Sequence, residues 1–222
     1  MRKGSNLLVI DVGGTNVKFL ATGQKNVVKI PSGLRMTPAL MVEELQKVIG
    51  QFKYTGVSIG YPGPVVNGRP ASEPHNLGPG WVAFDYEQAF GYPVKIINDA
   101  AMQALGSYEG GRMLFLGLGT GLGSALIVDG VVAPMELAHL PYRKGLTFED
   151  YVGLRGLERL GKKKWRLHVD DVIARLRAAL VADYVVLGGG NAKLLKELAQ
   201  GVRIGENSNA FRGGQRLWDE RV

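Results

Sequence analysis

Residues 7–18 read Leu-Leu-Val-Ile-Asp-Val-Gly-Gly-Thr-Asn-Val-Lys, an apolar run that ends in an acid and a turn of small residues. The pattern returns at residues 113–127 as Met-Leu-Phe-Leu-Gly-Leu-Gly-Thr-Gly-Leu-Gly-Ser-Ala-Leu-Ile. Each copy predicts a buried strand, a tight turn and a second strand, which together form a β-hairpin. The glycines allow backbone N–H groups to surround an oxyanion, and Thr15 and Thr120 add hydroxyl donors. The two turns therefore predict two phosphate-binding loops.

One acid distinguishes the two copies. Asp11 ends the first strand, whereas Gly117 stands at the equivalent place in the second copy. Glycine-rich turns are common in hairpins, so the prediction depends on the repeat and not on either turn alone. Two phosphate-binding turns with one acid on the metal side predict a cleft between two related halves that closes on a phosphoryl donor.

Composition limits the classes of protein that fit. The chain has 222 residues, a net charge of +7 and no cysteine, which excludes disulfides and thiolate metal sites. No apolar window approaches the length of a membrane span, and the N-terminus lacks the apolar stretch of a secretory signal. We therefore expect a cytoplasmic protein that does not bind a membrane. Eight basic and three acidic residues lie between Arg143 and Arg166, a stretch that forms either a solvated helical face or a track for a polyanion.

Periodicity predicts a mixed α/β sheet in each half of the chain. In the first half we expect strands over 6–11, 15–21, 26–30, 55–60 and 94–97, and helices over 38–50, 85–91 and 99–109. In the second half we expect strands over 112–117, 122–128 and 183–187, and helices over 146–161, 169–181, 191–200 and 207–218. Gly110-Gly111 is the expected hinge, giving an N-terminal domain over 1–110 and a C-terminal domain over 111–222.

Candidate catalytic residues follow the strand predicted over 94–97. Asn98 and Asp99 stand just before a helix, where the carboxyl ends of strands in α/β folds present their chemistry. Either residue could instead cap that helix, a role that is compatible with catalysis.

A second polar group surrounds Glu136 and His139, which are spaced to face the same side of one helical turn. Together with Glu149 and Asn76 they offer carboxylate, imidazole and amide groups suited to a polyhydroxylated ligand. A glutamate and a histidine can also bind a divalent metal, but no third ligand lies at close spacing, and we expect no zinc. His75 and His168 have no comparable neighbours in the sequence, and we expect them to be ordinary polar residues.

Six motifs resemble, in order, those of the ROK (repressor, open reading frame, kinase) family of sugar kinases, and most of all its polyphosphate glucokinase branch. They are Asp11–Thr15, Tyr61–Pro64, Asn98-Asp99, Gly117–Gly123, Glu136–His139 and Gly188–Asn191. The resemblance implies an actin-like (ribonuclease H-like) fold of two α/β domains with a duplicated mixed sheet. The chain departs from many members in lacking a cysteine-rich zinc loop after His139, in carrying Ala138 where a glycine is expected, and in being short.

The resemblance also implies a role for each matching residue. Asp99 is the general base, and Asp11 positions Mg²⁺ through water. The implied sugar ligands are Asn76, Asn98, Glu136, His139 and Glu149. The implied phosphate-binding residues are Gly13, Gly14, Thr15, Lys18, Thr120 and Gly121. Gly188, Gly189 and Gly190 approach the adenosine of a nucleotide.

The resemblance thus implies a kinase that transfers a phosphoryl group from polyphosphate, ATP or both to the 6-hydroxyl of glucose or a close hexose. A homodimer is compatible with it. The main alternative is a non-catalytic sugar sensor of the same fold. A nucleic-acid-binding module is the other alternative, but the basic stretch has few interleaved aromatic residues and no recognised nucleic-acid-binding motif.

Overall fold

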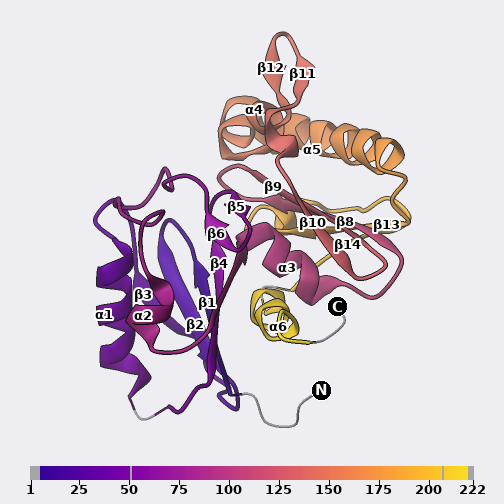
Figure 1. Ribbon diagram of the computed structural model, residues 1–222. Coiled ribbons are helices and arrows are strands. Elements are labelled where there is room, and N and C mark those ends of the chain that lie inside the picture. Colours follow the sequence, from indigo (N-terminus) through magenta and orange to yellow (C-terminus); the bar gives the residue numbers. More distant parts are fainter. Residues whose placement is uncertain (1–5, 51, 207, 220–222) are drawn as a thin grey trace. The chain divides into compact units, whose positions relative to one another are not determined.

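The computed structural model describes residues 6–50, 52–206 and 208–219 (Figure 1). Its contacts divide the chain into two compact units. Unit 1 consists of Met1–Met102 together with Ala210–Val222, and unit 2 consists of Gln103–Asn209. The division differs from the expected boundary at residue 110, because it falls inside a helix and because the C-terminal residues return to unit 1.

Unit 1 contains a five-stranded mixed sheet with the strand order β3-β2-β1-β4-β7. Its strands are β1 (Leu7–Val12), β2 (Asn16–Ala21), β3 (Val28–Pro31), β4 (Gly56–Tyr61) and β7 (Val94–Asn98), and β5 (Val65–Val66) and β6 (Arg69–Pro70) form a separate small hairpin. Strand β1 pairs antiparallel with β2 and parallel with β4, and β4 pairs parallel with β7. Three strands of unit 1 therefore point the same way and end at one edge.

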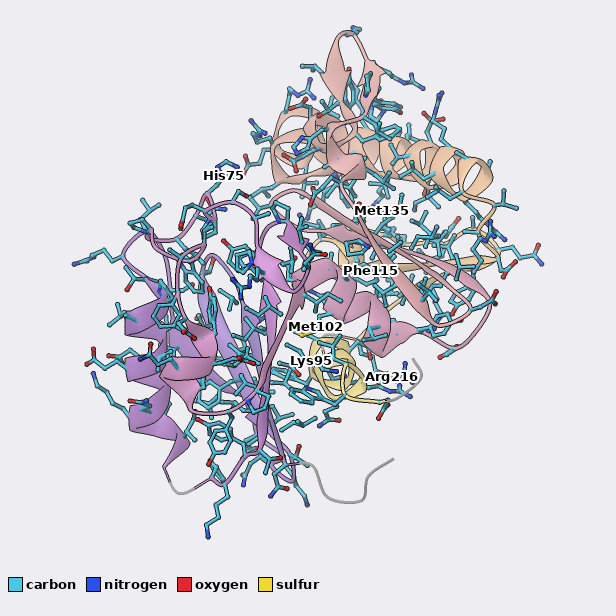
Figure 2. All side chains as sticks on the ribbon, in the orientation of Figure 1. His75, Lys95, Met102, Phe115, Met135 and Arg216 are labelled. Carbon is cyan, nitrogen blue, oxygen red and sulfur yellow. The ribbon has the colours of Figure 1, made fainter. Side chains whose placement is uncertain are left out.

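Helices cover both faces of this sheet. They are α1 (Pro38–Ile49), α2 (Tyr86–Phe90), α3 (Asp99–Ser107) and α6 (Asn209–Arg216). Leu8 and Ile10 belong to the hydrophobic core that α1 and α2 complete. Val9, which points to the opposite face, packs with Phe211 of α6 and with Met102, labelled in Figure 2. Because both faces of β1 are buried, every residue of the 7–12 run except Asp11 is apolar.

Unit 2 repeats the arrangement with the strand order β10-β9-β8-β13-β14. Its strands are β8 (Arg112–Leu118), β9 (Leu122–Val128), β10 (Val131–Met135), β13 (Tyr184–Gly188) and β14 (Val202–Ile204). The pairing directions match those of unit 1, since β8 is antiparallel to β9 and parallel to β13. The predicted duplicated mixed sheet is confirmed.

The remaining elements of unit 2 lie between β10 and β14. They are the 3₁₀ turn η1 (Leu137–His139), the hairpin strands β11 (Pro141–Arg143) and β12 (Leu146–Thr147), the helices α4 (Phe148–Val152) and α5 (Leu154–Ala179), and the 3₁₀ turn η2 (Ala192–Leu194). Trp165, Val169 and Val172 of α5 pack on Leu114 and Leu116 of β8, and Figure 1 shows the long α5 lying across the sheet of unit 2. Among the helices of the described residues, none is both long and apolar enough to cross a membrane.

Two predicted helices need correction. The helix expected over 191–200 is wrong, because only Ala192–Leu194 form a 3₁₀ turn and β14 follows. Its leucines have helical spacing, but a helix this short is marginal by itself. The helix expected from residue 146 begins instead at Phe148, and Gly161, with φ 73° and ψ 159°, interrupts α5. The stretch over 162–168, expected to be a gap between helices, is helical.

Strand β10 was not predicted, and its sequence explains why. Pro134 lies inside it, and proline argues against a strand unless that strand is at a sheet edge. Strand β10 is such an edge strand.

Candidate functional site

The carboxyl edge of the unit 1 sheet collects the predicted catalytic groups. In the parallel register Asp11 of β1 lies opposite Gly60 of β4, and Tyr61 lies opposite Asn98 of β7. Asp99 follows directly as the first residue of α3. Because parallel strands end at a common edge, unit 1 brings Asp11, Asn98 and Asp99 to one side of its sheet.

Asp11 forms an ion pair within the first hairpin. Its Oδ2 lies 3.1 Å from Nζ of Lys18, the residue directly opposite it on β2. The Asp11 side chain is 11% exposed and that of Lys18 is 41% exposed. The second hairpin has Gly117 opposite Gly123 near the same point of its ladder. The structure therefore shows a charged pair in one copy where the other has two glycines.

The turn after β1 is closed by its own backbone. The N–H of Gly13 donates to the carbonyl of Asn16 (3.1 Å), and the Ser32 hydroxyl donates to the carbonyl of Gly13. Within the described part of the chain, no internal acceptor is recorded for the N–H groups of Gly14 and Thr15. Two consecutive donors are thus available for an anion.

Asn76 lies against this turn. A side chain at Gly14 would have its Cβ 3.0 Å from Cβ of Asn76, so the glycine favours this close approach. Glu73 fixes the loop that carries Asn76 by accepting from the N–H groups of Trp81 (3.0 Å) and Val82 (3.1 Å). Sequence reasoning missed Glu73, because no spacing pattern indicated that its carboxylate would fold back on the loop.

Asn98 and Asp99 combine a structural role with their position at the sheet edge. Oδ1 of Asn98 accepts from the N–H of Ala101 (3.1 Å) and Nδ2 donates to the carbonyl of Gly63 (3.1 Å). Oδ1 of Asp99 accepts from the N–H of Ala100 at 2.7 Å. The helix-capping role left open for this pair is present in Asn98. Both side chains are half-buried, and an amide retains further donor and acceptor capacity.

The turn after β8 repeats the first one in unit 2. The N–H of Gly119 donates to the carbonyl of Gly121 (3.2 Å). Thr120 is exposed, and within the described residues no internal acceptor is recorded for its N–H or for that of Gly121. In each hairpin turn the N–H of the first glycine is thus hydrogen-bonded within the turn, and the N–H groups of the next two residues are available for an anion.

Glu149 rests on this second turn. Its Oε2 accepts from the N–H of Leu122 (3.2 Å), and its carboxylate occupies the space that a Cβ at Gly121 would need. Arg155 lies 3.5 Å from the other carboxylate oxygen. Gly121 therefore has a packing reason to be glycine that does not depend on phosphate.

Glu136 and His139 lie at the two ends of η1. This element is a 3₁₀ turn with Glu136 as its N-cap, so the expected helical turn is present in its tighter form. Ser124 holds the start of the turn, because its hydroxyl donates to the carbonyl of Met135 (2.8 Å) and accepts from the N–H of Leu137 (3.2 Å). Both Glu136 and His139 are exposed.

The glycines after β13 pack on the end of β8. Gly189 has φ 80°, and a Cβ there would overlap the backbone of Leu118; a Cβ at Gly188 would overlap the Phe115 ring. Asn191 joins this turn to the one after β8, since its Nδ2 donates to the carbonyl of Gly119 at 3.1 Å. Gly190 faces open space. Packing therefore accounts for two of the three glycines expected to approach adenosine.

The basic stretch divides into two kinds of residue. Arg143, Arg155, Arg159 and Arg166 each have a carboxylate or carbonyl partner. Lys162–Lys164 follow the break at Gly161, are exposed, and have no ion pair within the described residues.

The described residues contain no group of three His, Asp or Glu side chains able to hold a metal ion.

Comparison with known proteins supports the fold and the family. The sequence model of the ROK family matches residues 7–134, more than half of the chain. The chain is 29% identical over 205 residues to the polyphosphate glucokinase of Mycobacterium tuberculosis, an alignment that covers 82% of this chain and 76% of that protein. It is 26% identical to the polyphosphate glucokinase of Mycobacterium leprae, with 82% and 62% covered.

Solved structures have the same architecture. The inorganic polyphosphate/ATP-glucomannokinase of Arthrobacter sp. strain KM superposes with a TM-score of 0.78 at 25% identity, covering 95% of this chain and 97% of that one. The ROK hexokinase of Thermus thermophilus gives 0.74 at 20% identity, with 94% and 96% covered, and so shows the fold alone. The expected actin-like fold with two mixed sheets is confirmed.

Proposed function

Because the chain belongs to the ROK family, we propose that it is a hexose kinase. It transfers a phosphoryl group to the 6-hydroxyl of glucose or a close hexose, and its donor is polyphosphate, ATP or both. The similarity to polyphosphate glucokinases and to a polyphosphate/ATP-glucomannokinase supports both the reaction and the choice of donors.

One observation carries the proposal. The carboxylates of Asp11 and Asp99 and the amide of Asn98 stand at the carboxyl edge of three parallel strands, and the Gly13–Thr15 turn follows β1 at the same edge. A proton acceptor, a metal-side acid and an anion-binding turn are the groups that phosphoryl transfer to a hydroxyl needs. We assign these three roles to the groups at this edge of the unit 1 sheet.

Asp99 is the proposed general base. Phosphoryl transfer passes through a loose transition state, so catalysis depends mainly on positioning and on stabilising spread negative charge. The base therefore needs hydrogen-bonding reach to the 6-hydroxyl and not an unusual pKa. The bond to the N–H of Ala100 orients the Asp99 carboxylate for this purpose.

Mg²⁺ fits the acid in unit 1. Mg²⁺ prefers oxygen ligands, keeps several waters and is usually held by one or two carboxylates with substrate phosphates. Asp11 is a mostly buried carboxylate at the end of β1 and would hold the ion through water. The ion would offset the charge of the phosphate oxygens. Lys18 neutralises Asp11 at 3.1 Å and supplies a cation on the same side.

Five side chains are the proposed sugar ligands. In unit 1 they are Asn76, which touches the first turn, and Asn98. In unit 2 they are Glu136, His139 and Glu149, which belong to one continuous stretch of 14 residues. Carboxylates accept from sugar hydroxyls, while amides and imidazole both donate and accept.

Polyphosphate is the favoured donor. The glycines at 188 and 189 have packing reasons, which weakens the argument that this turn exists for adenosine. The exposed Lys162–Lys164 suit a long polyanion, because each phosphate neutralised by lysine releases counterions. ATP is the second donor we expect to be accepted.

A matrix of hexoses against donors tests the function. Glucose, mannose, fructose and N-acetylglucosamine are each incubated with Mg²⁺ and either polyphosphate or ATP, and the sugar phosphate is measured. We expect glucose with polyphosphate to give the highest kcat/KM. Sugar binding without phosphorylation by either donor would favour the sensor and contradict the kinase.

Asp99→Asn is the matched variant for the base. It keeps the shape of the side chain and removes the proton acceptor, and loss of a general base costs roughly 10²–10⁴-fold in kcat. We expect hexose binding, measured by calorimetry, to survive. The control is Asp129→Asn, the same change in the exposed turn between β9 and β10. A kcat of Asp99→Asn close to that of the control would remove Asp99 from this role.

A further inference from the structure

The chain between His139 and Glu149 forms a hairpin that is too small to be stable alone. Its strands β11 and β12 share only the pairs Pro141–Thr147 and Arg143–Leu146. Lys144 and Gly145 turn the chain with φ values of 53° and 73°. Isolated two-stranded hairpins are marginal in water, so contacts elsewhere must fix this one. Figure 1 shows it extending beyond α4 and α5.

Tyr142 supplies these contacts. Its hydroxyl donates to Oδ2 of Asp171 at 2.6 Å and lies 3.0 Å from Nδ1 of His168, both residues of α5. Its ring packs on α4, with centroid distances of 5.0 Å to Tyr151 and 5.3 Å to Phe148. One side chain of the hairpin thus contacts both helices.

Asp171 is the charged residue among the hydrogen-bond partners of Tyr142. The same oxygen that accepts from Tyr142 also accepts from Arg143 (3.1 Å) and from Arg175 (3.0 Å). Hydrogen bonds to an ionised carboxylate are about twice as strong as neutral ones. These donors lower the pKa of Asp171, so it stays ionised.

His168 completes the hydrogen bonding of Tyr142. A phenol has one proton, which goes to Asp171, so the Tyr142 oxygen accepts from Nδ1–H of His168. The Tyr151 ring meets the imidazole edge-on, with centroids 4.6 Å apart and an interplanar angle of 62°. His168, expected from the sequence to be an ordinary polar residue, therefore has two defined partners, Tyr142 and Tyr151.

We propose that Tyr142, His168 and Asp171 are positioning residues that fix the segment from Glu136 to Glu149 and so set the affinity for the hexose. The clamped hairpin begins two residues after His139, and the N–H of Phe148 donates to the carbonyl of Leu140 (3.1 Å) to close its base. Phe148 and Tyr151, which the Tyr142 ring touches, flank Glu149 on α4. The part that concerns the hexose rests on the proposed function.

We call the contacts of Tyr142 with His168 and Asp171 the clamp. Tyr142→Phe tests the clamp, because it keeps the ring and removes the hydroxyl. Loss of the hydrogen bonds of the Tyr142 hydroxyl should raise the equilibrium constant for opening of the segment from Glu136 to Glu149 by about fivefold to tenfold. We expect amide hydrogen exchange over residues 137–152 to rise by that factor, and the KM for hexose to rise similarly. The kcat and the donor KM should change less than twofold, a split that general destabilisation would not produce.

Tyr184→Phe is the matched control. It removes a phenol hydroxyl in the same unit, where that oxygen accepts from the N–H of Glu109 (3.0 Å), and exchange over 137–152 should not change. Unchanged exchange in Tyr142→Phe would overturn the clamp. Faster exchange with an unchanged hexose KM would overturn the positioning role. If wild-type protein phosphorylates no hexose, the proposed function fails, and the exchange comparison still decides whether the clamp exists.

A pH series gives a second readout. The groups that face His168 are Tyr142 and Arg143 of the hairpin, Tyr151 of α4, and Arg159 and Asp171 of α5. Burial and Arg143 lower the pKa of His168, so the clamp favours neutral imidazole and weakens as pH falls below about 6.5. Exchange over 137–152, corrected for its intrinsic pH dependence, should rise below that pH in wild type and stay flat in His168→Asn. The same rise in both proteins would exclude His168.

Discussion

Substitution of single residues in unit 2 tests whether the proposed hexose site is separate from the proposed donor site. Glu136 is an exposed carboxylate at the start of η1, outside the two glycine turns that we propose bind phosphate. Glu136→Gln replaces a charged acceptor by a neutral one, which weakens hydrogen bonds worth about 1.5–3 kcal/mol. We expect the hexose KM to rise about 10-fold to 100-fold, with the donor KM nearly unchanged, in steady-state assays that vary each substrate.

Glu158→Gln is the control for this prediction, since Glu158 is an exposed carboxylate on α5. Equal increases in the two KM values would show that Glu136 acts on the fold of the site as a whole. Stoichiometric zinc in the purified protein, measured by elemental analysis, would contradict the assignment of Glu136 and His139 to the sugar.

Some contacts in the structure are local in sequence and others are not. The pairing of Asp11 with Lys18, which was not predicted, is local, because the turn fixes the register of the hairpin. The contact of Tyr142 with His168 joins residues 26 positions apart, and no periodicity spans that distance. The close approach of Glu149 to Gly121 is of the same kind, because it depends on how α4 packs on β9.

At the scale of elements, the strands beside the glycine turns were predictable because apolar runs and glycine turns are local signals, whereas the edge strands β10 and β14 were not predicted. The stretch over 191–200 shows the limit. It has leucines at helical spacing, yet Asn191 is tied to the turn after β8 and Leu195 is buried beside α5. Tertiary contacts determine the conformation of such short segments, and these contacts cannot be inferred from the local sequence.

Helix α6 shows the opposite case, a helix that forms despite its glycines. Gly213 and Gly214 are poor helix formers, but Gly214 allows the helix to lie directly on Val9 and Ser58. The Ser58 hydroxyl donates to the carbonyl of Gly214 (2.6 Å), and Nε1 of Trp218 donates to Ser58 (2.8 Å). Packing on the unit 1 sheet therefore stabilises α6.

Gly214→Ala tests which effect dominates. Helix propensity alone predicts stabilisation by about 1 kcal/mol, whereas a Cβ would overlap the Val9 side chain. Overpacking of this kind costs about 1–3 kcal/mol, so we expect a lower Tm and a lower free energy of unfolding in urea. Arg212→Ala, an exposed change in the same helix, should stay within about 0.5 kcal/mol. A higher Tm for Gly214→Ala would show that α6 does not pack tightly.

For the whole molecule, the order of the chain does not give the division into units. Unit 1 needs α6 from the far end of the chain to cover Val9 and Met102. A boundary read from a Gly-Gly pair assumes that each unit is continuous in sequence. The apolar residues of α6 do not indicate which sheet the helix covers. The return of the chain to unit 1 therefore could not be predicted.

The net charge of the molecule leads to the last prediction. Four arginines of the basic stretch have internal partners, and its exposed lysines are Lys144 in the hairpin turn and the consecutive Lys162–Lys164 on α5. The three consecutive lysines are the part that we expect to bind a polyanion. Changing these three lysines to glutamine lowers the net charge from +7 to +4. The matched control changes Lys25, Lys29 and Lys53 of unit 1, which are also exposed, and gives the same net charge.

We expect the Lys162–Lys164 variant to raise the KM for polyphosphate and leave the KM for ATP almost unchanged. The wild-type KM for polyphosphate should fall with chain length and rise steeply with salt, because phosphate contacts release counterions. Each lysine removed should lower the slope of log KM against log salt by about 0.7–0.9 if it contacts phosphate. The control variant changes only the long-range field, so its slope should stay closer to that of wild type. Equal slopes in the two variants, or activity with ATP alone that neither change affects, would show that Lys162–Lys164 form a solvated helical face.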